Sequence, residues 1–261
     1  MEHKLQDIVK SQLEHRTIRE FKQEPIASDL FDTLMEAARR TPTSNGMQSS
    51  SIIRITDPQV KQAIAEICNQ DYVATAPELL IFIVDQHRNQ AIALEKRAAE
   101  SKVTKHHDTE LHAADMDRFF QGFTDACITA QNVLVAAEAM GLGVVYLGSI
   151  LNDSQRLCQL LALPQLTFPV VGLGIGYPNQ HPDQKPRMKR ELRVFENQYQ
   201  VFDQYLKVIQ SYDEEMENYY DLRNANQRVD KFSDQIVTRL STANPKRQQL
   251  LQVVREQGFH E

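Results

Sequence analysis

Glycine is scarce in this sequence, and so are cysteine, positive charge and long apolar runs. The 261 residues include only 9 glycines, roughly half the usual 7%, and six of them fall between Gly141 and Gly176. Cys68, Cys127 and Cys158 are too few and too widely spaced for a disulfide framework or a paired-cysteine metal site. Concentrated glycine indicates a region where the backbone needs close approach or unusual turns.

The other absences narrow the class of protein. A formal charge of −6, from 29 Lys and Arg against 35 Asp and Glu, argues against a dedicated nucleic-acid binder, which needs a basic surface. The N-terminal segment MEHKLQDIVKSQLEHR has no apolar stretch of the signal-peptide type. The longest stretch without formal charge, 157–182, is interrupted by prolines and so does not predict a membrane span. We therefore expect a cytoplasmic protein in a reducing compartment.

Enough apolar sequence is present for a sizeable core, and its spacing predicts an α+β fold. Hydrophobic residues make up 41% of the chain. Helices are expected at 3–14, 28–40, 120–141, 153–161, 203–220, 233–240 and 245–256, with a further one starting at Asp57-Pro58. Strands are expected at 50–56, 79–84, 144–147 and 169–175. Short strands among many helices favour α+β over a doubly wound sheet.

Three of these helices carry sharper predictions. Asp57 is expected to cap its helix with Pro58 at the first helical position, and Ser28 to cap the helix over 28–40. Apolar residues from Phe120 to Ala137 recur at alternating steps of three and four, which predicts a central, largely buried helix. Gly141 is expected to end it.

The glycine cluster resembles a nucleotide-binding loop only superficially. Gly172-Leu-Gly-Ile-Gly176 has the wrong spacing for a dinucleotide fingerprint, and Tyr177-Pro178 follows where that motif needs a helix. Close packing of a strand against a large neighbour explains these glycines better. The group Tyr146-Leu-Gly-Ser149 ends a strand, where bare backbone can lie against a flat ligand.

Basic residues in two segments form a candidate phosphate site. Arg16 and Arg19 flank Thr17-Ile18, and Lys185-Pro-Arg187 lies in a polar loop. Guanidinium groups bind phosphate oxygens bidentately, although each pair considered alone is as typical of a solvated surface. A metal site is not expected at His106, His107, Asp108 and His112, because the spacing of the histidines does not place them on one helix face. No G-x-S-x-G motif is present for Ser-His-Asp catalysis.

Taken together, several motifs resemble the nitroreductase superfamily. They are HRTIREF at 15–21, SSIIRITD at 50–57, GLGVVYLG at 141–148, VVGLGIGYP at 170–178 and DQKPR at 183–187. More narrowly, the chain is similar to oxygen-insensitive NADPH nitroreductases and NADPH–flavin oxidoreductases with a longer C-terminal extension. The resemblance implies a nitroreductase-like α+β fold, with a central mixed, mainly antiparallel sheet flanked by helices. It also implies an intertwined homodimer, formed by a single FMN-binding domain over 1–261 whose extension, from about 198 to 261, wraps the partner subunit.

The same resemblance assigns residues to a non-covalent FMN between two subunits. The residues expected to hold phosphate, ribityl and the pyrimidine edge are His15, Arg16, Thr17 and Arg19, with Lys185 and Arg187 clamping the phosphate. Thr43 lies on a loop that reaches the flavin, and Gln70 on the polar edge of the ring. Tyr146, Leu147, Gly148 and Ser149 pass along the ring, with a backbone N–H near N5. Arg223 and Arg228 match positions that hold the 2′-phosphate of NADPH, with Lys246 and Arg247 as weaker candidates; the alternative for Arg223 and Arg228 is two exposed arginines without a role.

We therefore expect an FMN-dependent oxidoreductase that takes hydride from NADPH, or from NADH, at flavin N5. The acceptors would be nitroaromatics, quinones or free flavin. The isoalloxazine carries the hydride, so no catalytic base or nucleophile is required. Two alternatives stay open: a reductase that supplies reduced flavin to a partner, and a flavin-binding protein without turnover. The charged, largely helical segment 86–118 resembles an insertion, and the loop 41–50 departs from Ser-rich family versions at Asn45 and Gly46, which bears on acceptor preference.

Overall fold

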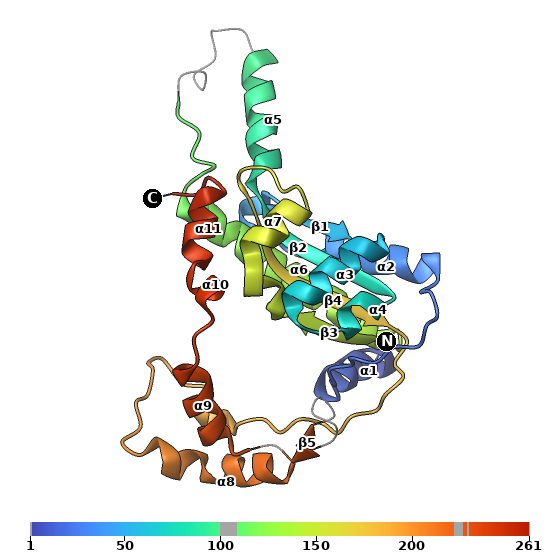
Figure 1. Cartoon of the computed structure of the whole chain (residues 1–261), viewed down its shortest axis with the longest axis vertical. Coiled ribbons are helices and arrows are strands. Elements are labelled where there is room, and N and C mark those ends of the chain that lie inside the picture. The colour runs from blue at the N-terminus through green and yellow to red at the C-terminus, as the bar shows by residue number, and fades with distance from the viewer. Residues whose placement is uncertain (1, 100–108, 222–226, 229, 261) are drawn as a thin grey trace. The chain divides into compact units, whose positions relative to one another are not determined.

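The computed structural model describes residues 2–99, 109–221, 227–228 and 230–260, and the chain forms two compact units (Figure 1). Unit 1 comprises the N-terminal residues up to 13, residues 17–180 and the C-terminal residues from 244. Unit 2 comprises residues 14–16 and 181–243. Each unit is described by itself below.

Unit 1 is built on a four-stranded sheet. The strands are β1 (Ser50–Arg54), β2 (Glu78–Asp85), β3 (Gly143–Leu147) and β4 (Thr167–Gly176), in the spatial order β1-β2-β4-β3. Every neighbouring pair is antiparallel. The predicted α+β class is confirmed, and the sheet is more uniformly antiparallel than expected, since parallel pairing in the described residues is limited to isolated bridges such as Thr17–Val144.

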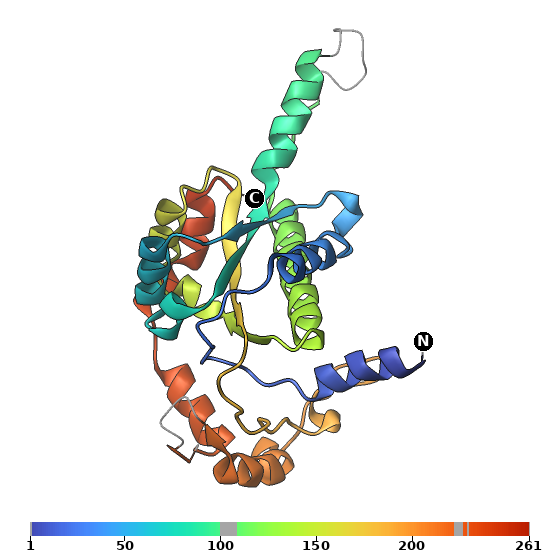
Figure 2. The same ribbon diagram turned by 90° about the vertical axis from the view of Figure 1, so that its right-hand side faces the viewer.

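The core of unit 1 lies on both faces of β2. This strand is buried along its whole length. Leu80, Phe82 and Val84 face one apolar cluster, while the residues between them face another, as expected for a strand covered on both sides. Figure 2 shows the two layers. Helices α2 (Ser28–Arg39) and α6 (Met116–Ala139) cover the first face, and α3 (Pro58–Cys68) and α4 (Tyr72–Thr75) cover the second.

Helix α6 is central and largely buried, as predicted, and Ala130, Leu134 and Ala137 of the expected face lie in the core. The exception is Phe120, which is 60% exposed, while the neighbouring Phe119 is buried, so the aromatic contact shifts by one residue. The shift follows from packing: the Phe119 ring makes edge contacts with Phe168 and Phe259, at centroid distances of 5.7 and 5.1 Å. The helix ends as predicted, just before a glycine of positive φ at 141.

The N-terminal cap of α3 was predicted correctly, because an aspartate directly precedes a proline there. Asp57 Oδ1 accepts hydrogen bonds from the N–H groups of Gln59 and Val60 at 2.7 and 3.4 Å, which confirms the cap. The prediction that Ser28 caps α2 is wrong, because Ala27 occupies the N-cap position and no side chain accepts a hydrogen bond from the first turn. Helix α5 (Gln86–Ala99) occupies the start of the insertion-like segment and projects from the sheet (Figure 2), whereas residues 109–115 are not helical.

The C-terminal residues return to unit 1. The helix predicted over 245–256 is divided into two helices, α10 (Pro245–Gln248) and α11 (Leu250–Glu256). The helix predicted over 153–161 is α7 (Ser154–Leu160). Val253, Val254 and Phe259 are buried in the core cluster with α6. The prediction that the extension wraps a partner therefore concerns residues 198–243, because the residues from 244 pack within their own chain.

The described part of unit 2 contains two α-helices and little core. Helices α8 (Tyr205–Asn218) and α9 (Phe232–Ser241) pack through Tyr212 and Phe232, whose ring centroids are 5.1 Å apart. The Asp213 carboxylate joins them, accepting hydrogen bonds from Ser233 N and Oγ at 2.9 and 2.7 Å. The short strands β5 (Tyr220–Asp221) and β6 (Gln227–Arg228) pair antiparallel, and a 3₁₀ turn, η3 (Arg190–Leu192), completes the unit.

Candidate functional site

The segment 17–22 runs beside the edge strand β3. Ile18 N donates a hydrogen bond to Val144 O at 3.0 Å, and Thr17 and Val144 form a parallel bridge. Arg19 N donates to the side-chain oxygen of Gln180 at 3.0 Å. This pairing places Thr17 beside the start of β3, and the hydrogen bond of Arg19 N places that residue beside Gln180, which follows β4.

This pairing is close because β3 begins with a glycine. A Cβ at Gly143 would lie 2.7 Å from Ile18 Cγ1, so no side chain fits there. Gly143 therefore allows a close approach of two backbones. At the facing end of β4, a Cβ at Gly176 would lie 2.7 Å from Pro77 Cγ, which confirms the tight packing predicted for that strand.

A short 3₁₀ turn, η2 (Gly148–Asp153), follows β3 and carries the residues predicted to face a flat ligand. Apart from the adjoining backbone, no heavy atom of the described residues lies within 4 Å of a Cβ built on Gly148, so that side of the turn is open. Ser149 Oγ and Tyr72 Oη both donate to Gln70 Oε1, at 3.0 and 2.9 Å. With its oxygen engaged, Gln70 offers its amide N–H groups to a ligand.

Tyr146 forms the exposed end of the same strand. Its side chain is 38% exposed, and Oη donates to Gln131 Oε1 at 3.1 Å. Burial, reinforced by Cys127, raises the pKa of Tyr146 well above its ordinary value. The phenol is therefore a neutral hydrogen-bonding group rather than an acid–base catalyst at physiological pH.

The C-terminal helix α10 holds the η2 turn. Arg247 Nη1 donates to Gly148 O at 3.0 Å and to Asn152 Oδ1 at 3.2 Å. Lys246 Nζ forms an ion pair with Asp153. Burial alone would raise the pKa of Asp153, but bonds from Lys246 and from Arg156 N hold it below its ordinary value. Both basic residues, which the sequence suggests as weaker NADPH ligands, are thus engaged with this turn.

The remaining predicted flavin ligands lie in unit 2. His15, Arg16, Lys185 and Arg187 all belong to it. Arg16 Nη1 donates to Glu14 O at 2.8 Å, while its Nε is buried without a hydrogen-bond partner among the described residues. The exposed Arg187 folds back onto its loop, with Nη1 donating to Lys185 O at 2.9 Å. A buried guanidinium nitrogen without a partner fits a site for an anion.

Thr43 lies on a loop that precedes β1, and a buried carboxylate organises this loop. Asp125 on α6 is fully buried and accepts hydrogen bonds from Ser44 N at 2.8 Å and Ser49 N at 3.1 Å. The turn between them is η1 (Ser44–Gly46). Sequence reasoning missed Asp125, although an acidic residue inside the apolar stretch 119–137 is a signal for such a role.

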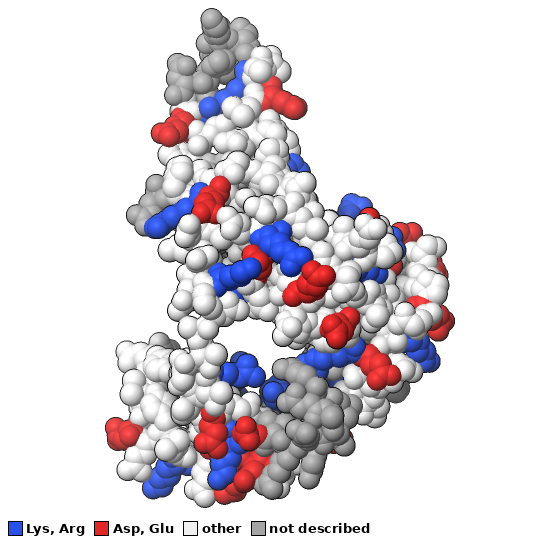
Figure 3. All heavy atoms as spheres, in the orientation of Figure 1, with Lys and Arg blue, Asp and Glu red and all other residues white. Residues whose placement is uncertain are grey.

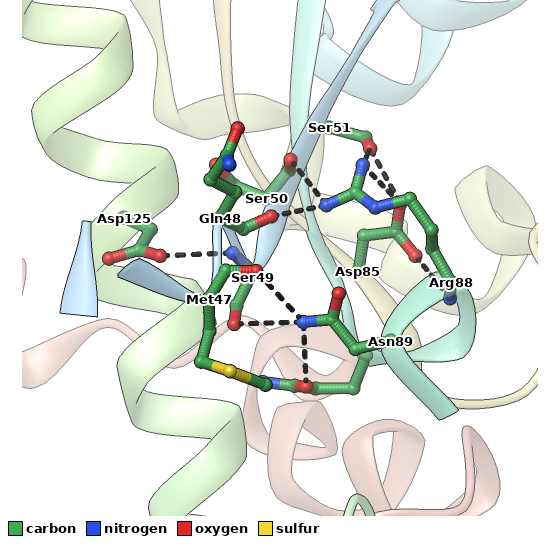
Figure 4. A network of polar contacts seen from close by, with 10 residues as sticks. Met47, Gln48, Ser49, Ser50, Ser51, Asp85, Arg88, Asn89 and Asp125 are labelled. Atoms are coloured by element: carbon green, nitrogen blue, oxygen red, sulfur yellow. Dashed lines mark hydrogen bonds and ion pairs between the residues drawn. The ribbon is translucent and has the colours of Figure 1, made fainter. Parts of the chain in front are cut away.

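The first turn of α5 fixes the same loop from the other side (Figure 4). Arg88 donates to Ser51 Oγ at 2.8 Å and to the carbonyls of Gln48 and Ser50. Asn89 Nδ2 donates to Met47 O at 3.1 Å. The insertion-like segment thus begins by anchoring the loop that carries Thr43, and no pattern in the sequence indicates these contacts.

Within one chain, the Thr43 loop and the η2 turn lie at opposite edges of the sheet. The loop leads into β1 and the turn follows β3, the two edge strands. Because three strand-to-strand spacings separate the two edges, the distance between them is roughly 14 Å. The structure therefore does not bring Thr43 together with Gly148 and Gln70.

Other predicted residues are not placed. Arg223 lies outside the described residues, and Arg228 is described only as part of β6. His106, His107 and Asp108 also lie outside them, while His112 Nδ1 is 3.2 Å from Asp115 Oδ2. The described part of the chain holds no cluster of three metal-binding side chains, and none of its helices could span a bilayer. Acidic and basic side chains are interspersed on the face in Figure 3.

The α+β fold with its antiparallel four-stranded sheet matches that of solved nitroreductase structures. The nitroreductase family model matches residues 13–177, and the model of the family's C-terminal domain matches residues 185–261. The chain belongs to the nitroreductase family and is an oxidoreductase.

The relatives narrow the comparison. The chain is 37% identical to an oxygen-insensitive NADPH nitroreductase of Salmonella typhimurium, over 94% of this chain and 95% of the relative. It is 33% identical to an NADPH-flavin oxidoreductase of Vibrio harveyi, over 98% and 99% of the two chains. The structure of a Vibrio harveyi NADPH:FMN oxidoreductase complexed with NAD⁺ aligns with a TM-score of 0.82 at 31% identity, covering 97% of this chain and 98% of that one.

Proposed function

We propose that this protein binds FMN and transfers hydride from NADPH to small acceptors such as nitroaromatics, quinones or free flavin. The relatives that support this are named as NADPH nitroreductase and NADPH-flavin oxidoreductase. The observation that carries it is the end of β3, where the turn is open at Gly148 and flanked by the donor end of Gln70.

The residues present fit the cofactor. When bound, FMN would supply the hydride-carrying isoalloxazine. Gln70 would donate to a flavin carbonyl oxygen, because its own oxygen already accepts two bonds. Arg16, Lys185 and Arg187 would hold the phosphate, and the partnerless Nε of Arg16 fits that role. Thr17, Arg19, His15 and the backbone of 146–149 would contact the remaining polar atoms, with a backbone N–H near N5.

We propose that the working site is formed by two copies of the chain. Thr43 and the η2 turn lie at opposite edges of one sheet, so a Thr43 loop that reaches the flavin fits better as a contribution from a second subunit. Residues 198–243 would wrap that subunit. Such a shared site makes the homodimer a requirement for cofactor binding.

The first test is spectroscopic and separates enzyme from binder. The purified protein is expected to be yellow with FMN, and its flavin absorbance to bleach when NADPH is added without oxygen. A yellow protein that stays oxidised with both nicotinamides would be a flavin carrier without turnover. A colourless protein that cannot be reconstituted with FMN would contradict the proposal altogether.

The second test concerns release of reduced flavin. A reductase that supplies a partner would turn over free FMN with a steady-state rate that exceeds its rate with nitroaromatics or quinones. Measuring kcat/KM for each acceptor with NADPH and with NADH decides between a reductase of free flavin and a reductase of nitroaromatics and quinones.

Arg223 is proposed to hold the 2′-phosphate of NADPH. Arg223→Ala should raise KM for NADPH at least tenfold with little change for NADH, because only NADPH carries the extra phosphate. Arg239→Ala, which removes an exposed arginine of α9, is the matched control. Equal changes for both nicotinamides would remove this role from Arg223.

A further inference from the structure

Arg247 reaches the candidate flavin site from the far end of the chain. It is 99 residues from Gly148 in sequence, yet its Nη1 lies 3.0 Å from Gly148 O. The backbone of α10 is fixed by Asn244, whose Oδ1 accepts from Lys246 N and Arg247 N at 3.1 and 3.3 Å, and by Pro245 at the first helical position. A half-buried guanidinium on a capped turn is a rigidly placed charge.

The carbonyl that Arg247 binds belongs to a single peptide unit with the N–H of Ser149. A cation at the oxygen end of a peptide draws electron density from it and makes the N–H at the other end a stronger donor. The Ser149 side chain is itself held by Gln70 at 3.0 Å. The peptide is therefore fixed from both sides and polarised in one direction, without reorganisation when a ligand changes charge.

We propose that Arg247 is a positioning residue that orients and polarises the Gly148–Ser149 peptide, and thereby stabilises reduced FMN relative to oxidised FMN. This inference rests on the proposed function, in which this turn lies along the flavin. Reduction places negative charge on the isoalloxazine, so a polarised donor and a nearby cation favour the reduced form. Arg247 thus sets the flavin potential without touching the cofactor.

The neighbouring residue provides a matched control. Lys246 carries the same charge on the same helical turn, but it pairs with Asp153 at the other end of η2. Arg247 alone of the two contacts the Gly148 carbonyl in the described structure. A general loss of positive charge would therefore affect both variants, whereas loss of peptide polarisation affects only Arg247.

The experiment measures FMN affinity in both oxidation states. Wild type, Arg247→Gln, Arg247→Lys and Lys246→Gln are titrated with oxidised FMN and, anaerobically, with reduced FMN. Arg247→Gln is expected to lower the preference for reduced FMN about tenfold, which for a two-electron couple corresponds to a midpoint potential lower by about 30 mV. Arg247→Lys should fall between it and wild type, because a lysine keeps the charge but lacks the planar guanidinium whose Nη1 donates to both Gly148 O and Asn152 Oδ1.

Two results would overturn the proposal. One is an unchanged preference in Arg247→Gln; the other is an equal loss in Lys246→Gln. If Arg247→Gln does not fold, Arg247→Lys decides: a preference equal to wild type overturns the proposal, and a lower preference with Lys246→Gln unchanged supports it. Failure of the proposed function is distinguishable, since the wild-type protein would then fail to bind FMN or to bleach with NADPH.

Discussion

At the scale of single residues, the glycines at the two ends of β3 have opposite roles. Glycine is required at position 143 because the Ile18 side chain occupies the space of a Cβ, which would lie 2.7 to 2.8 Å from three Ile18 atoms. Gly148 meets nothing within 4 Å in the described structure, and its φ is not in the left-handed region. The fold therefore requires the first glycine but not the second.

Alanine substitutions at these glycines should separate fold from ligand. Gly143→Ala should lower the free energy of unfolding by about 1–3 kcal/mol through overpacking. Gly148→Ala should leave it unchanged and weaken FMN binding, because the new methyl group occupies the proposed flavin side. Urea unfolding of the apo-protein and FMN titration measure the two effects. Wild-type affinity in Gly148→Ala would place the flavin elsewhere.

The buried thiol of Cys158 makes stability depend on alkaline pH. Burial raises its pKa to about 12 from an ordinary 9.0. The folded protein therefore retains this proton, while the unfolded chain releases it above pH 9. The contribution of the buried thiol to the free energy of unfolding is thus fully present below pH 9 and is lost as pH rises toward 12. Cys158→Ala lacks it. Between pH 8 and 10, the stability difference between wild type and variant should shrink by about 1.4 kcal/mol, whereas parallel urea-unfolding results would contradict this.

At the scale of elements, helix α6 fixes a loop as well as the core. Its apolar character and most of its buried positions follow from the sequence, but the burial of Phe119 in place of Phe120 does not, because it depends on the rings that Phe119 meets in β4 and at the C-terminus. The same helix places Asp125 beneath the loop that carries Thr43.

Loss of the Asp125 carboxylate should release that loop. Asp125→Asn removes a charged acceptor of two backbone N–H groups and should destabilise the protein by about 2 kcal/mol, with faster amide hydrogen exchange at 44–49. Asp117→Asn is the matched control on the same helix, since its exposed carboxylate accepts from the Gln121 side chain rather than from backbone N–H groups of the loop, and it should change stability by no more than about 0.5 kcal/mol. Equal effects of the two variants would show that the buried bonds are not special.

At the scale of the whole molecule, unit 2 has an apolar surface that its own residues do not bury. Leu240 is 84% exposed and Val237 66%. Val237 borders a hollow of about 570 Å³ that is lined mainly by apolar side chains of α8 and α9, and Leu240 lies three residues further along α9. Exposed apolar area of this kind is typical of an interface, in agreement with the proposed homodimer.

A charge on this surface should weaken the dimer. The wild-type protein should have a mass of twice 30.0 kDa in solution. Leu240→Lys should raise the dimer dissociation constant at least tenfold, about 1.4 kcal/mol, and lower FMN occupancy with it. Thr238→Lys, on the same helix, is the control. Light scattering over a dilution series measures both, and an unaffected dimer would place the interface elsewhere.

The sequence by itself determined most of the elements, the buried strands and the helix starts at Asp57-Pro58 and Asn244-Pro245, because these depend on residues within a few positions of one another. It also carried the motifs that identify the family. Only the tertiary structure decided that Arg247 holds Gly148, that Asp125 and Arg88 anchor the Thr43 loop, and that the last residues pack into unit 1. Such contacts join residues far apart in the chain. They depend on how the faces of helices and strands pack together, which no local pattern encodes. The positions of the scarce glycines therefore showed where the backbone is exposed, but not which residues hold it in place.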